Sequence, residues 1–441
     1  MTGRYKAYSE YKESNYEWLG DVPSHWDVTY SKWLFSERNN KANRSDEMLT
    51  ASQKYGVIPQ KLFMKLEQQK VVQVQKGHDI LKQVKRNDFV ISMRSFQGGI
   101  EFCEYNGAVS SAYVPLEPKN ELSLSYFKYL FKSKPYIQAL QATTNLVRDG
   151  QALRYNNFLQ AKLPIPQHNE AEKIGSFLDH ETAKIDILIT KQEKLIELLK
   201  EKRQAVISHA VTKGLNPDAS MKDSGVEWLG EVPEHWGVTR FKFLCENIIA
   251  GPFGSSITKD MYVKSGFRVY GQEQVIPNDF NIGDYFISAE DYLSLARYKV
   301  NTGDVLISCV GTFGKVAVFP PTAQAGIINP RLIKTKIHKD SSPYFIREYL
   351  KSVTVAKQFD QFSRGGTMGV INIAILNEIV STKPPYAEQF EICDFIKVEK
   401  SKFSLLLNRC EKQIALLKER KTALISAAVT GKIDVRDWSE H

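Results

Sequence analysis

The chain has 441 residues, 42% of them hydrophobic, which is enough for two or more domains with real cores and excludes a disordered protein. No stretch approaches the roughly 18 uncharged apolar residues of a membrane span, and the first residues lack the apolar core of a signal peptide, so we expect a cytoplasmic protein. Lys and Arg number 59 against 50 Asp and Glu, a balance that permits a polyanionic partner without requiring one.

The first predicted element lies near the amino terminus and is repeated 210 residues later. Residues 17–35 and 227–245 align without a gap and agree at 12 of 19 positions, including two Trp and one His in each copy. Trp, Pro and aliphatic residues so close together favour a segment that seals a domain onto its neighbour, with a docking patch for another subunit as the alternative. Because His25 and His235 have no second ligand at metal spacing, we interpret them as structural.

The repeated openings are followed by two middles of different sequence, at about 20–165 and 230–383. Short β-type runs separated by turn residues predict mixed α/β domains there. Each middle also holds an amphipathic helix candidate, residues 123–140 and residues 341–359. The β-type runs are residues 87–95, 107–116, 266–276, 303–319 and 325–337.

A long helix is predicted after each middle. Residues 169–212 contain no Pro, many Glu and Lys, and apolar residues three and four apart. Residues 181–212 return as 399–430 with 16 of 32 positions identical, and Gly214 and Gly431 follow as helix stops. About 44 helical residues reach on the order of 65 Å, so we expect a coiled-coil-like pair, antiparallel if the halves are related by a pseudo-twofold axis. The predicted seam is Ile185, Leu188, Leu195, Leu199 and Val206, with Phe403, Leu406, Leu417 and Leu424 in the second copy.

These segments predict a tandem duplication with four parts. They are a first domain at 1–166, a first long helix at 167–214, a second domain at 215–384, and a second long helix with a tail at 385–441. The predicted fold class is α/β (α+β): two globular domains separated by two long helices that form an antiparallel coiled coil. Different middles on a constant frame suggest two different readers on one scaffold.

Motifs of catalysis and metal binding are missing from the sequence. There is no phosphate-binding GxxxxGK[ST], HExxH, GxSxG or GxGxxG pattern, and the five cysteines form no CxxC pair. The KPPY sequence begins with Lys383, where amino-methyltransferases need a carboxylate or carboxamide. Residues 311–315 lie between two β-type runs, which favours a hairpin tip over a nucleotide-binding turn. Residues 117–119 have the ExK spacing of a nuclease without its acidic partner. We therefore predict no catalytic residue and no metal ligand.

Four loops combine basic, amide or hydroxyl side chains with glycine: 94–99, 148–150, 311–315 and 363–367. Arg and Lys can contact guanine, Gln can pair with adenine, and nearby glycines let backbone N–H groups approach phosphates. Ordinary exposed turns are the alternative for any single residue, whereas the set favours nucleic acid. The candidate DNA-binding residues are Arg94, Ser95, Gln97, Arg148, Arg154, Gln272, Thr312, Lys315, Arg331, Arg364 and Thr367.

With these residues in view, the chain resembles the specificity subunit of type I restriction-modification systems over essentially its whole length. The resemblance is carried by the doubled EWLG.VP.HW opening, by GDVLIS..GT.GK.A at 303–317, and by the domain exit PP..EQ..I at 384–392. The first half departs from the pattern, because Ala171 replaces the usual Gln of the exit and residues 87–99 follow GDVLIS loosely.

The resemblance implies two target recognition domains, each reading one half of a bipartite site in double-stranded DNA, held apart by the two long helices. It implies two methyltransferase subunits docked along those helices, with motor and nuclease subunits adding restriction. This chain is then non-catalytic and carries no cofactor, because S-adenosylmethionine, ATP and Mg²⁺ belong to the partners. The candidate partner-binding residues are Leu195, Leu199, Val206, Leu417 and Leu424.

Two other classes of function fit part of the sequence. One is a self-contained DNA methyltransferase or nuclease, which turnover by the purified chain alone would reveal. The other is a coiled-coil adaptor without a nucleic-acid role, for which DNA binding by the assembled complex would be absent or insensitive to salt.

Overall fold

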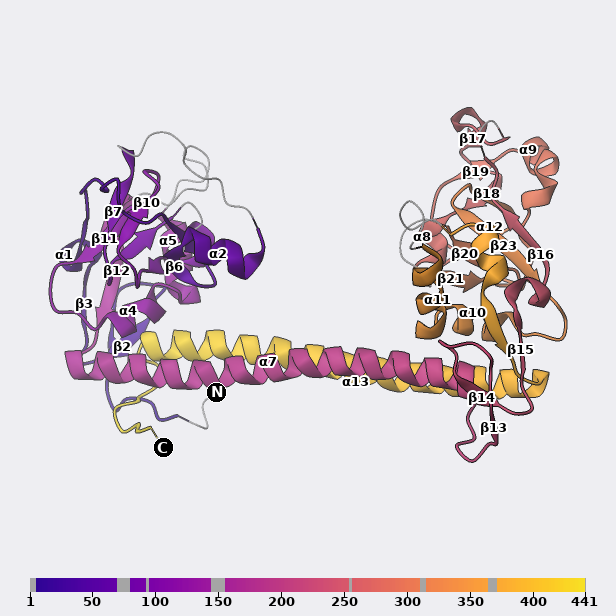
Figure 1. Cartoon of the computed structure of the whole chain (residues 1–441). Helices are drawn as coiled ribbons and strands as arrows, with labels where there is room; N and C mark the ends of the chain where they lie inside the picture. The colour runs from indigo at the N-terminus through magenta and orange to yellow at the C-terminus, as the bar shows by residue number, and fades with distance from the viewer. Residues whose placement is uncertain are drawn as a thin grey trace. The chain divides into compact units, whose positions relative to one another are not determined.

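The computed structural model describes residues 5–69, 80–92, 95–143, 155–253, 256–309, 315–363 and 371–440 (Figure 1). The chain divides into unit 1, Met1–Glu193 with Glu411–His441, and unit 2, Lys194–Cys410. Two long helices, α7 (His168–Lys213) and α13 (Tyr386–Val429), each contribute residues to both units. Among the helices of the described ranges, none is long and apolar enough to cross a membrane.

Unit 1 is built around a four-stranded antiparallel sheet in the order β4–β11–β8–β9. All three residues of β8 are buried, because the strand is apolar throughout and is covered on both faces. Short strand pairs β1–β2, β3–β12, β5–β6 and β7–β10 surround the sheet. The strands are β1 (Tyr11–Glu13), β2 (Asp21–Pro23), β3 (Asp27–Tyr30), β4 (Phe35–Glu37), β5 (Leu49–Ser52), β6 (Gly56–Pro59), β7 (Lys82–Val84), β8 (Phe89–Ile91), β9 (Glu101–Phe102), β10 (Gly107–Val109), β11 (Val114–Pro118) and β12 (Lys162–Ile165).

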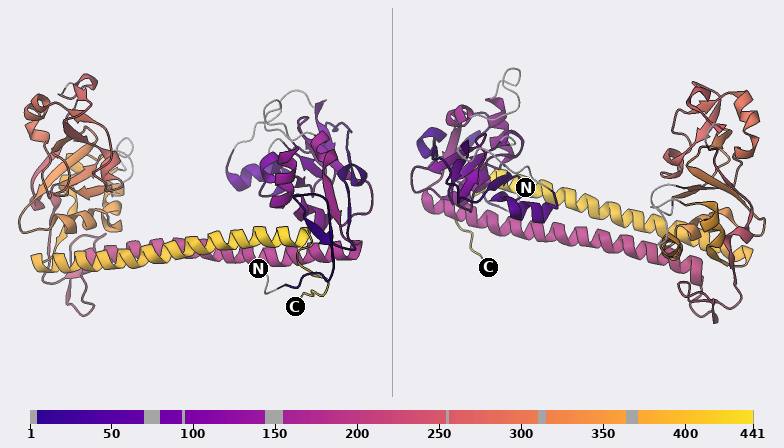
Figure 2. Two further views of the ribbon diagram at one scale, coloured as in Figure 1. Left: turned by 180° about the vertical axis from the view of Figure 1, so that it is seen from behind. Right: turned by 45° about the horizontal axis from the view of Figure 1, so that its top comes forward.

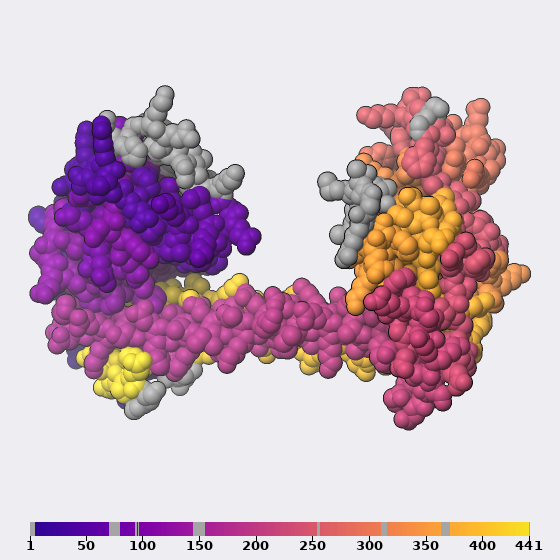
Figure 3. All heavy atoms as spheres, in the orientation of Figure 1, coloured from indigo at the N-terminus to yellow at the C-terminus, as the bar shows by residue number. Residues whose placement is uncertain are grey.

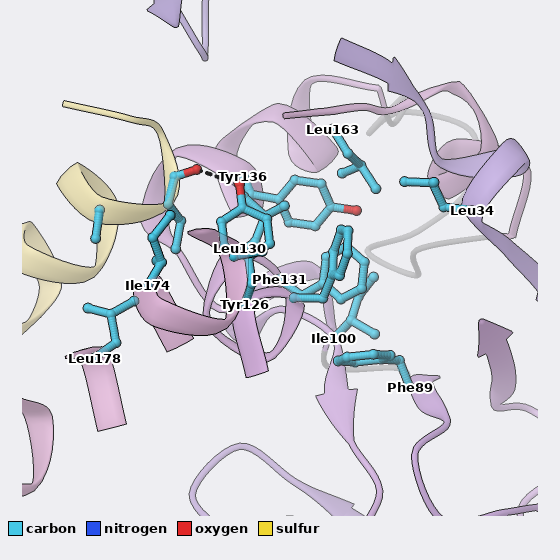
Figure 4. Close-up of a cluster of buried hydrophobic side chains, with 14 of the residues drawn as sticks. Leu34, Phe89, Ile100, Tyr126, Leu130, Phe131, Tyr136, Leu163, Ile174 and Leu178 are labelled. Carbon is cyan, nitrogen blue, oxygen red and sulfur yellow. Dashed lines mark hydrogen bonds between the residues drawn. The ribbon is translucent and has the colours of Figure 1, made fainter. Parts of the chain in front are cut away.

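The core of unit 1 joins this sheet to its helices (Figure 4). Phe89 of the sheet meets Phe131 with ring centroids 5.0 Å apart, and Phe131 in turn meets Tyr136. The hydroxyl of Tyr126 donates to the carbonyl oxygen of Val429 (2.8 Å), so the end of α13 belongs to the same core. The shorter helices of this unit are α1 (Ser31–Leu34), α2 (Gln60–Glu67), α3 (Ser95–Gly98), α4 (Leu124–Leu130), α5 (Lys134–Ala142) and α6 (Tyr155–Gln160).

The helix predicted at 123–140 is two helices, α4 and α5, with a break at residues 131–133. A continuous helix would need an N–H at Pro135 to bond Phe131, and proline has none, whereas it is well placed in the first turn of a new helix. The candidate at 341–359 divides at the same point into α10 (Pro343–Leu350) and α11 (Val353–Ser363). The single-helix prediction was therefore wrong in both halves.

Unit 2 repeats the plan of unit 1. Its antiparallel sheet has the order β16–β23–β20–β21, which matches β4–β11–β8–β9 element by element, so the internal repeat is confirmed. A second sheet, β17–β19–β18–β22, is added, in which β18 and β22 run parallel. The strands are β13 (Met221–Asp223), β14 (Glu231–Pro233), β15 (Gly237–Arg240), β16 (Cys245–Ala250), β17 (Tyr262–Val263), β18 (Phe267–Tyr270), β19 (Phe286–Ile287), β20 (Val305–Ser308), β21 (Val316–Val318), β22 (Gly326–Ile328), β23 (Leu332–Ile337) and β24 (Val380–Lys383).

The β-type run predicted at 266–276 ends as a strand at Tyr270. Helix α8 (Gln272–Val275) follows, because the side-chain oxygen of Gln274 accepts the N–H of Gly271 (2.7 Å) and caps the helix start. The remaining helices of unit 2 are α9 (Ala289–Ser294) and α12 (Ile373–Glu378), with short 3₁₀ helices η2 (Phe241–Leu244), η4 (Lys259–Met261) and η5 (Ala296–Tyr298).

Within each unit, α7 and α13 run side by side in opposite directions, as predicted (Figures 1 and 2). In unit 1, the ammonium group of Lys421 lies 2.6 Å from an oxygen of Asp186. In unit 2, Ile207 and Ile396 share one core. Gly214 and Gly431 follow the two helices with φ of 79° and 71°, so both stops are left-handed turns that favour glycine.

The seam between the helices differs from the prediction at Leu195, which is 41% exposed, and at two corresponding positions. Leu188 and Leu406 are exposed by 45% and 41%, whereas Ile189 and Leu407 are buried. At about 100° per residue, a position four after Ile185 lies roughly 40° from it and a position three after lies about 60° away on the other side. The sequence alone is compatible with either Leu188 or Ile189 in the seam, and in the structure it is Ile189, four residues after Ile185, that is buried.

Candidate nucleic-acid interface

In unit 1, one carboxylate joins the repeated opening segment to the first turn of α7. Glu170 accepts hydrogen bonds from the indole N–H of Trp26 (2.9 Å) and from the hydroxyl of Tyr8 (2.7 Å), and its second oxygen lies 2.8 Å from Nε2 of His25. An anion is favoured at the amino end of a helix. Since Trp26 is fully buried, the segment seals the domain onto its own long helix, and His25 is structural.

Unit 2 repeats this contact with Glu388 at the start of α13. Glu388 accepts from the indole N–H of Trp236 (2.8 Å) and lies 2.6 Å from Nε2 of His235. The contact is more open than in unit 1, because the side chain of Glu388 is 34% exposed against 5% for Glu170. The two contacts fix each globular part on the helix that follows it, and so orient the loops that it carries.

Several of the predicted DNA-binding residues lie outside the described residues: Arg94, Arg148, Arg154, Thr312, Arg364 and Thr367. Two of the others begin helix α3. The hydroxyl of Ser95 is buried and accepts the N–H of Ser92 (2.8 Å), so it shapes the turn. Gln97, two residues later, is exposed. Lys315 precedes β21 in unit 2 and is partly exposed.

Gln272 and Arg331 line one pocket of about 780 Å³ in unit 2, which we call the sheet pocket. Gln272 opens α8, and its amide donates to the hydroxyl of Ser308 (2.6 Å). The backbone N–H of Arg331 donates to the side-chain oxygen of Asn329 (2.9 Å), in the turn between β22 and β23, and the Arg331 side chain is exposed. The residues of the sheet pocket used below are Lys259, Tyr262, Gln272, Tyr285, Asn329 and Arg331.

Lys259, Tyr262, Tyr285 and Asn329 were missed in the sequence. The rings of Tyr262 and Tyr285 meet edge to face with centroids 5.2 Å apart at one side of the sheet pocket. Residues 259–264 place one tyrosine between two lysines, a signal that could have pointed to the pocket, because aromatic faces and cations together suit nucleic acid. Tyr285 and Asn329 join the pocket through the fold alone.

The described part of the chain contains no group of three or more His, Cys, Asp and Glu placed to hold a metal ion. All five cysteines are free. Burial raises the pKa of the Cys103 and Cys309 thiols to about 12, so neither is a thiolate at neutral pH.

The predicted partner-binding residues divide between surface and core. Leu195 is 41% exposed, Leu199 and Val206 are partly exposed, and Figure 3 shows α7 (magenta) open on the face in view. Leu417 packs against the core of unit 1, and Leu424 is buried within it, so Leu424 is not available on the surface.

The sequence model of the type I restriction modification DNA specificity domain matches residues 25–198. The chain is 23% identical over 373 residues to the type I restriction enzyme MjaVIII specificity subunit of Methanocaldococcus jannaschii, covering 80% of this chain and 81% of that protein. The chain is similar to type I restriction-modification specificity subunits.

Two solved structures share the fold of this chain. A chain from a structure of a type I R-M system aligns with a TM-score of 0.69 at 14% identity, covering 93% of this chain and 99% of that one. The HsdS subunit from Thermoanaerobacter tengcongensis aligns with a TM-score of 0.55 at 15% identity, covering 96% and 100%. The predicted fold class, two mixed α/β parts with long paired helices, is therefore confirmed.

The surface of the chain differs between its two units at one helix end. In unit 2, Val206 and Phe395 line an apolar pocket of about 440 Å³, the helix pocket. Phe177 holds the position of Phe395 in unit 1, where Tyr5 and Trp438 pack on it with ring centroids 5.4 and 5.7 Å away. Phe177 is consequently buried, whereas Phe395 is 37% exposed.

Proposed function

We propose that this chain is the non-catalytic DNA-specificity subunit of a type I restriction-modification complex. Each unit reads one half of a bipartite site in double-stranded DNA. The chain also binds two methyltransferase subunits, and restriction and motor subunits join this complex. The observation that carries the proposal is the sheet pocket, where Gln272 and Arg331 converge from distant parts of the sequence. An amide and a guanidinium in one concave surface match the donors that read adenine and guanine.

Base reading is assigned to the loops of both units. Gln97 and Lys315 are accessible, and Arg94, Arg148, Arg154, Thr312, Arg364 and Thr367 complete the set with Gln272 and Arg331. Ser95 holds the turn that presents its neighbours. If Arg364 reads a base, alanine there relaxes one position of the second half-site at a cost of about 1–3 kcal/mol, whereas a uniform loss makes it a phosphate contact.

The two long helices are proposed to set the spacing of the half-sites. Helices of 46 and 44 residues are about 69 and 66 Å long at 1.5 Å per residue. A paired helical spacer would fix both the separation and the helical phase of two readers, as half-site spacing is fixed in dimeric repressors. The exposed Leu195 and the partly exposed Leu199 and Val206 offer apolar surface for a partner on the same helices.

The chemistry is assigned to the partners. The sequence lacks catalytic motifs, so S-adenosylmethionine, ATP and Mg²⁺ are expected on methyltransferase and motor subunits rather than here. A target adenine must leave the base stack to reach a methyltransferase pocket. In this arrangement one subunit holds the duplex while its partner flips the base. The role requires the cytoplasm, where cellular DNA is accessible.

Two measurements test the proposal. The purified chain, given DNA with S-adenosylmethionine or with Mg²⁺, is expected to show neither methylation nor cleavage, and turnover would make it an enzyme. The complex with its methyltransferase is expected to bind DNA with an affinity that falls steeply with salt, because phosphate neutralisation releases counterions. Binding that is absent, or that salt does not change, would instead support the adaptor.

A further inference from the structure

Each unit has a pocket at the junction between its globular part and the two long helices. The unit 1 junction pocket has about 520 Å³ and the unit 2 junction pocket about 270 Å³. They are lined by corresponding residues of the internal repeat: Lys421 of unit 1 matches Arg203 of unit 2, and Lys132 matches Lys351. The charged side chains at this place in the fold can therefore be compared directly between the two units.

In the unit 1 junction pocket, the cations have carboxylate partners. Lys421 lies 2.6 and 2.7 Å from the two oxygens of Asp186. Lys132 lies 2.5 Å from Oε1 of Glu101, whose side chain is buried. Each of these two cations therefore has a carboxyl partner, and the two contacts join elements of unit 1.

In unit 2 both of these carboxylates are missing. Ser404 holds the position of Asp186 on the long helix. Ala317 holds the position of Glu101, because Leu306 of β20 pairs with Ala317 as Val90 of β8 pairs with Glu101. The two cations that these acids would balance are retained as Arg203 and Lys351, so the change leaves positive charge at the junction.

The unit 2 junction pocket holds a cluster of cations around one carboxylate. Glu348 is already shared, since Lys400 lies 2.5 Å from one of its oxygens and Arg347 lies 2.7 Å from the other. Within the described residues, the side chains of Arg203 and Lys351 make no hydrogen bond and no ion pair. Among the described residues that line the pocket, three cations thus stand against one anion, Glu348, which also pairs with the neighbouring Arg347.

The position of Lys351 is fixed rather than flexible. The side-chain amide of Gln204 donates to the carbonyl oxygen of Lys351 (2.9 Å), and the hydroxyl of Ser208 accepts the N–H of Val353 at the start of α11 (3.0 Å). Burial lowers the pKa of Lys351 to about 8, with Arg347, Lys400 and Lys315 adding repulsion and Glu348 opposing it. A half-buried cation just before the amino end of an 11-residue helix, α11, is placed to receive an anion.

We propose that the unit 2 junction pocket binds a backbone phosphate of DNA through Arg203 and Lys351. Lys315, one of the residues that the proposed function assigns to DNA, acts on Lys351 by charge repulsion. The inference rests on that proposed function for the identity of the anion. The contact carries no sequence information and holds unit 2 on the duplex while its loops read bases.

Arg203→Gln and Lys351→Gln in the full chain test the proposal on a pool of random-sequence duplexes. Lys421→Gln, which alters the corresponding cation of unit 1, and Lys351→Arg, which keeps the charge, are the matched controls. For each glutamine variant of unit 2, the slope of log affinity against log salt should decrease in magnitude by about 0.9. When salt is raised from 50 to 200 mM, each of these variants should therefore lose roughly threefold less DNA affinity than the wild type loses. Both controls should keep the slope of the wild type.

The pH dependence supplies a readout that a structural role would not give. As pH rises from 7 to 9, the wild type should lose DNA affinity because Lys351 deprotonates, whereas Lys351→Arg should not. Thermal unfolding checks that the variants are folded, and Lys351→Gln removes a poorly solvated charge and should not lower the melting temperature.

The possible results separate the two proposals. A wild type with salt-dependent binding and unit 2 variants with an unchanged slope would overturn the phosphate contact and leave the specificity subunit intact. A wild-type complex without salt-dependent binding would overturn the proposed function itself. Stabilisation by inorganic phosphate that Arg203→Gln abolishes, with an unchanged DNA slope, would assign the pocket to free phosphate and overturn the DNA contact.

Discussion

The indole N–H of Trp26 donates to Oε1 of Glu170 over 2.9 Å, joining the opening segment of the chain to a helix that begins more than 140 residues later. Both side chains are buried, and the hydroxyl of Tyr8 donates to the same oxygen (2.7 Å). The contact recurs as Trp236 with Glu388. Each globular part is therefore fixed to a long helix by the same donor and acceptor.

Glu170→Ala should lower the free energy of unfolding of unit 1 by about 3 kcal/mol, because Trp26 and Tyr8 keep buried donors without an acceptor. Glu388→Ala is the matched control and should cost about 1–2 kcal/mol, since Glu388 and His235 are partly open to water. Urea unfolding of the full chain measures both. Equal losses in the two variants would contradict this account of the contact.

Unit 1 should become less stable as the pH rises, because of Glu101. Burial raises the pKa of Glu101 from 4.5 to about 7, against the charge and hydrogen bond of Lys132, and the second oxygen of Glu101 has no hydrogen bond in the described structure. The folded state thus holds this proton more tightly than the unfolded state. The stabilisation is complete below pH 4.5 and is lost as the pH rises to about 7, amounting to about 3 kcal/mol.

Glu101→Gln removes this titration, and other carboxylates act equally in both proteins. Urea unfolding at several pH values between 4.5 and 8 should show the wild type losing stability relative to the variant over that range. Parallel curves for the two proteins would mean that Glu101 is ionised in the folded state throughout.

The sequence was sufficient for the parts of the fold that repeat or that have a strong period. The helix predicted at 169–212 is α7, His168–Lys213, because an apolar stripe and a glycine stop act locally. The choice between Leu188 and Ile189 for the seam was not local, since it depends on the partner helix. The added sheet of unit 2 depends on parallel pairing between β18 and β22, residues that lie far apart in the sequence.

Specificity for one position of the second half-site should depend on Arg331. Arg331→Ala should relax that position at a cost of about 1–3 kcal/mol, if its guanidinium reads a guanine. Lys259→Ala, in the same sheet pocket, is the control for charge and should weaken binding uniformly across sequences. Competition binding with a library of site variants distinguishes the two patterns. A uniform loss for Arg331→Ala would make it a phosphate contact.

The candidate site was predictable one residue at a time but not as a surface. Gln272 and Arg331 were candidates by residue type, whereas Tyr285 and Asn329 reach the sheet pocket from separate parts of the fold. The lost carboxylate at Ser404 is visible in an alignment of the two halves. Its consequence for Arg203 depends on the packing of α7 against α13, which the alignment does not contain.

Shortening both long helices together should shorten the spacer between the half-sites. Deleting residues 190–196 of α7 and 408–414 of α13 removes one heptad at corresponding places and keeps the seam in phase. Seven residues span about 10.5 Å, the length of about three base pairs. Methylation by the assembled complex should move to sites with a shorter spacer and the same half-sites. An unchanged spacer would contradict the role of the helices as a ruler.

The most direct test of the account is methylome sequencing of cells with and without this chain, beside a methyltransferase subunit that binds it. The account predicts that methylated adenines appear in a single bipartite motif, two defined half-sites at a constant separation, when the chain is present, and disappear when it is removed. A methylome that does not change with the chain, or a single continuous motif without a spacer, would contradict it.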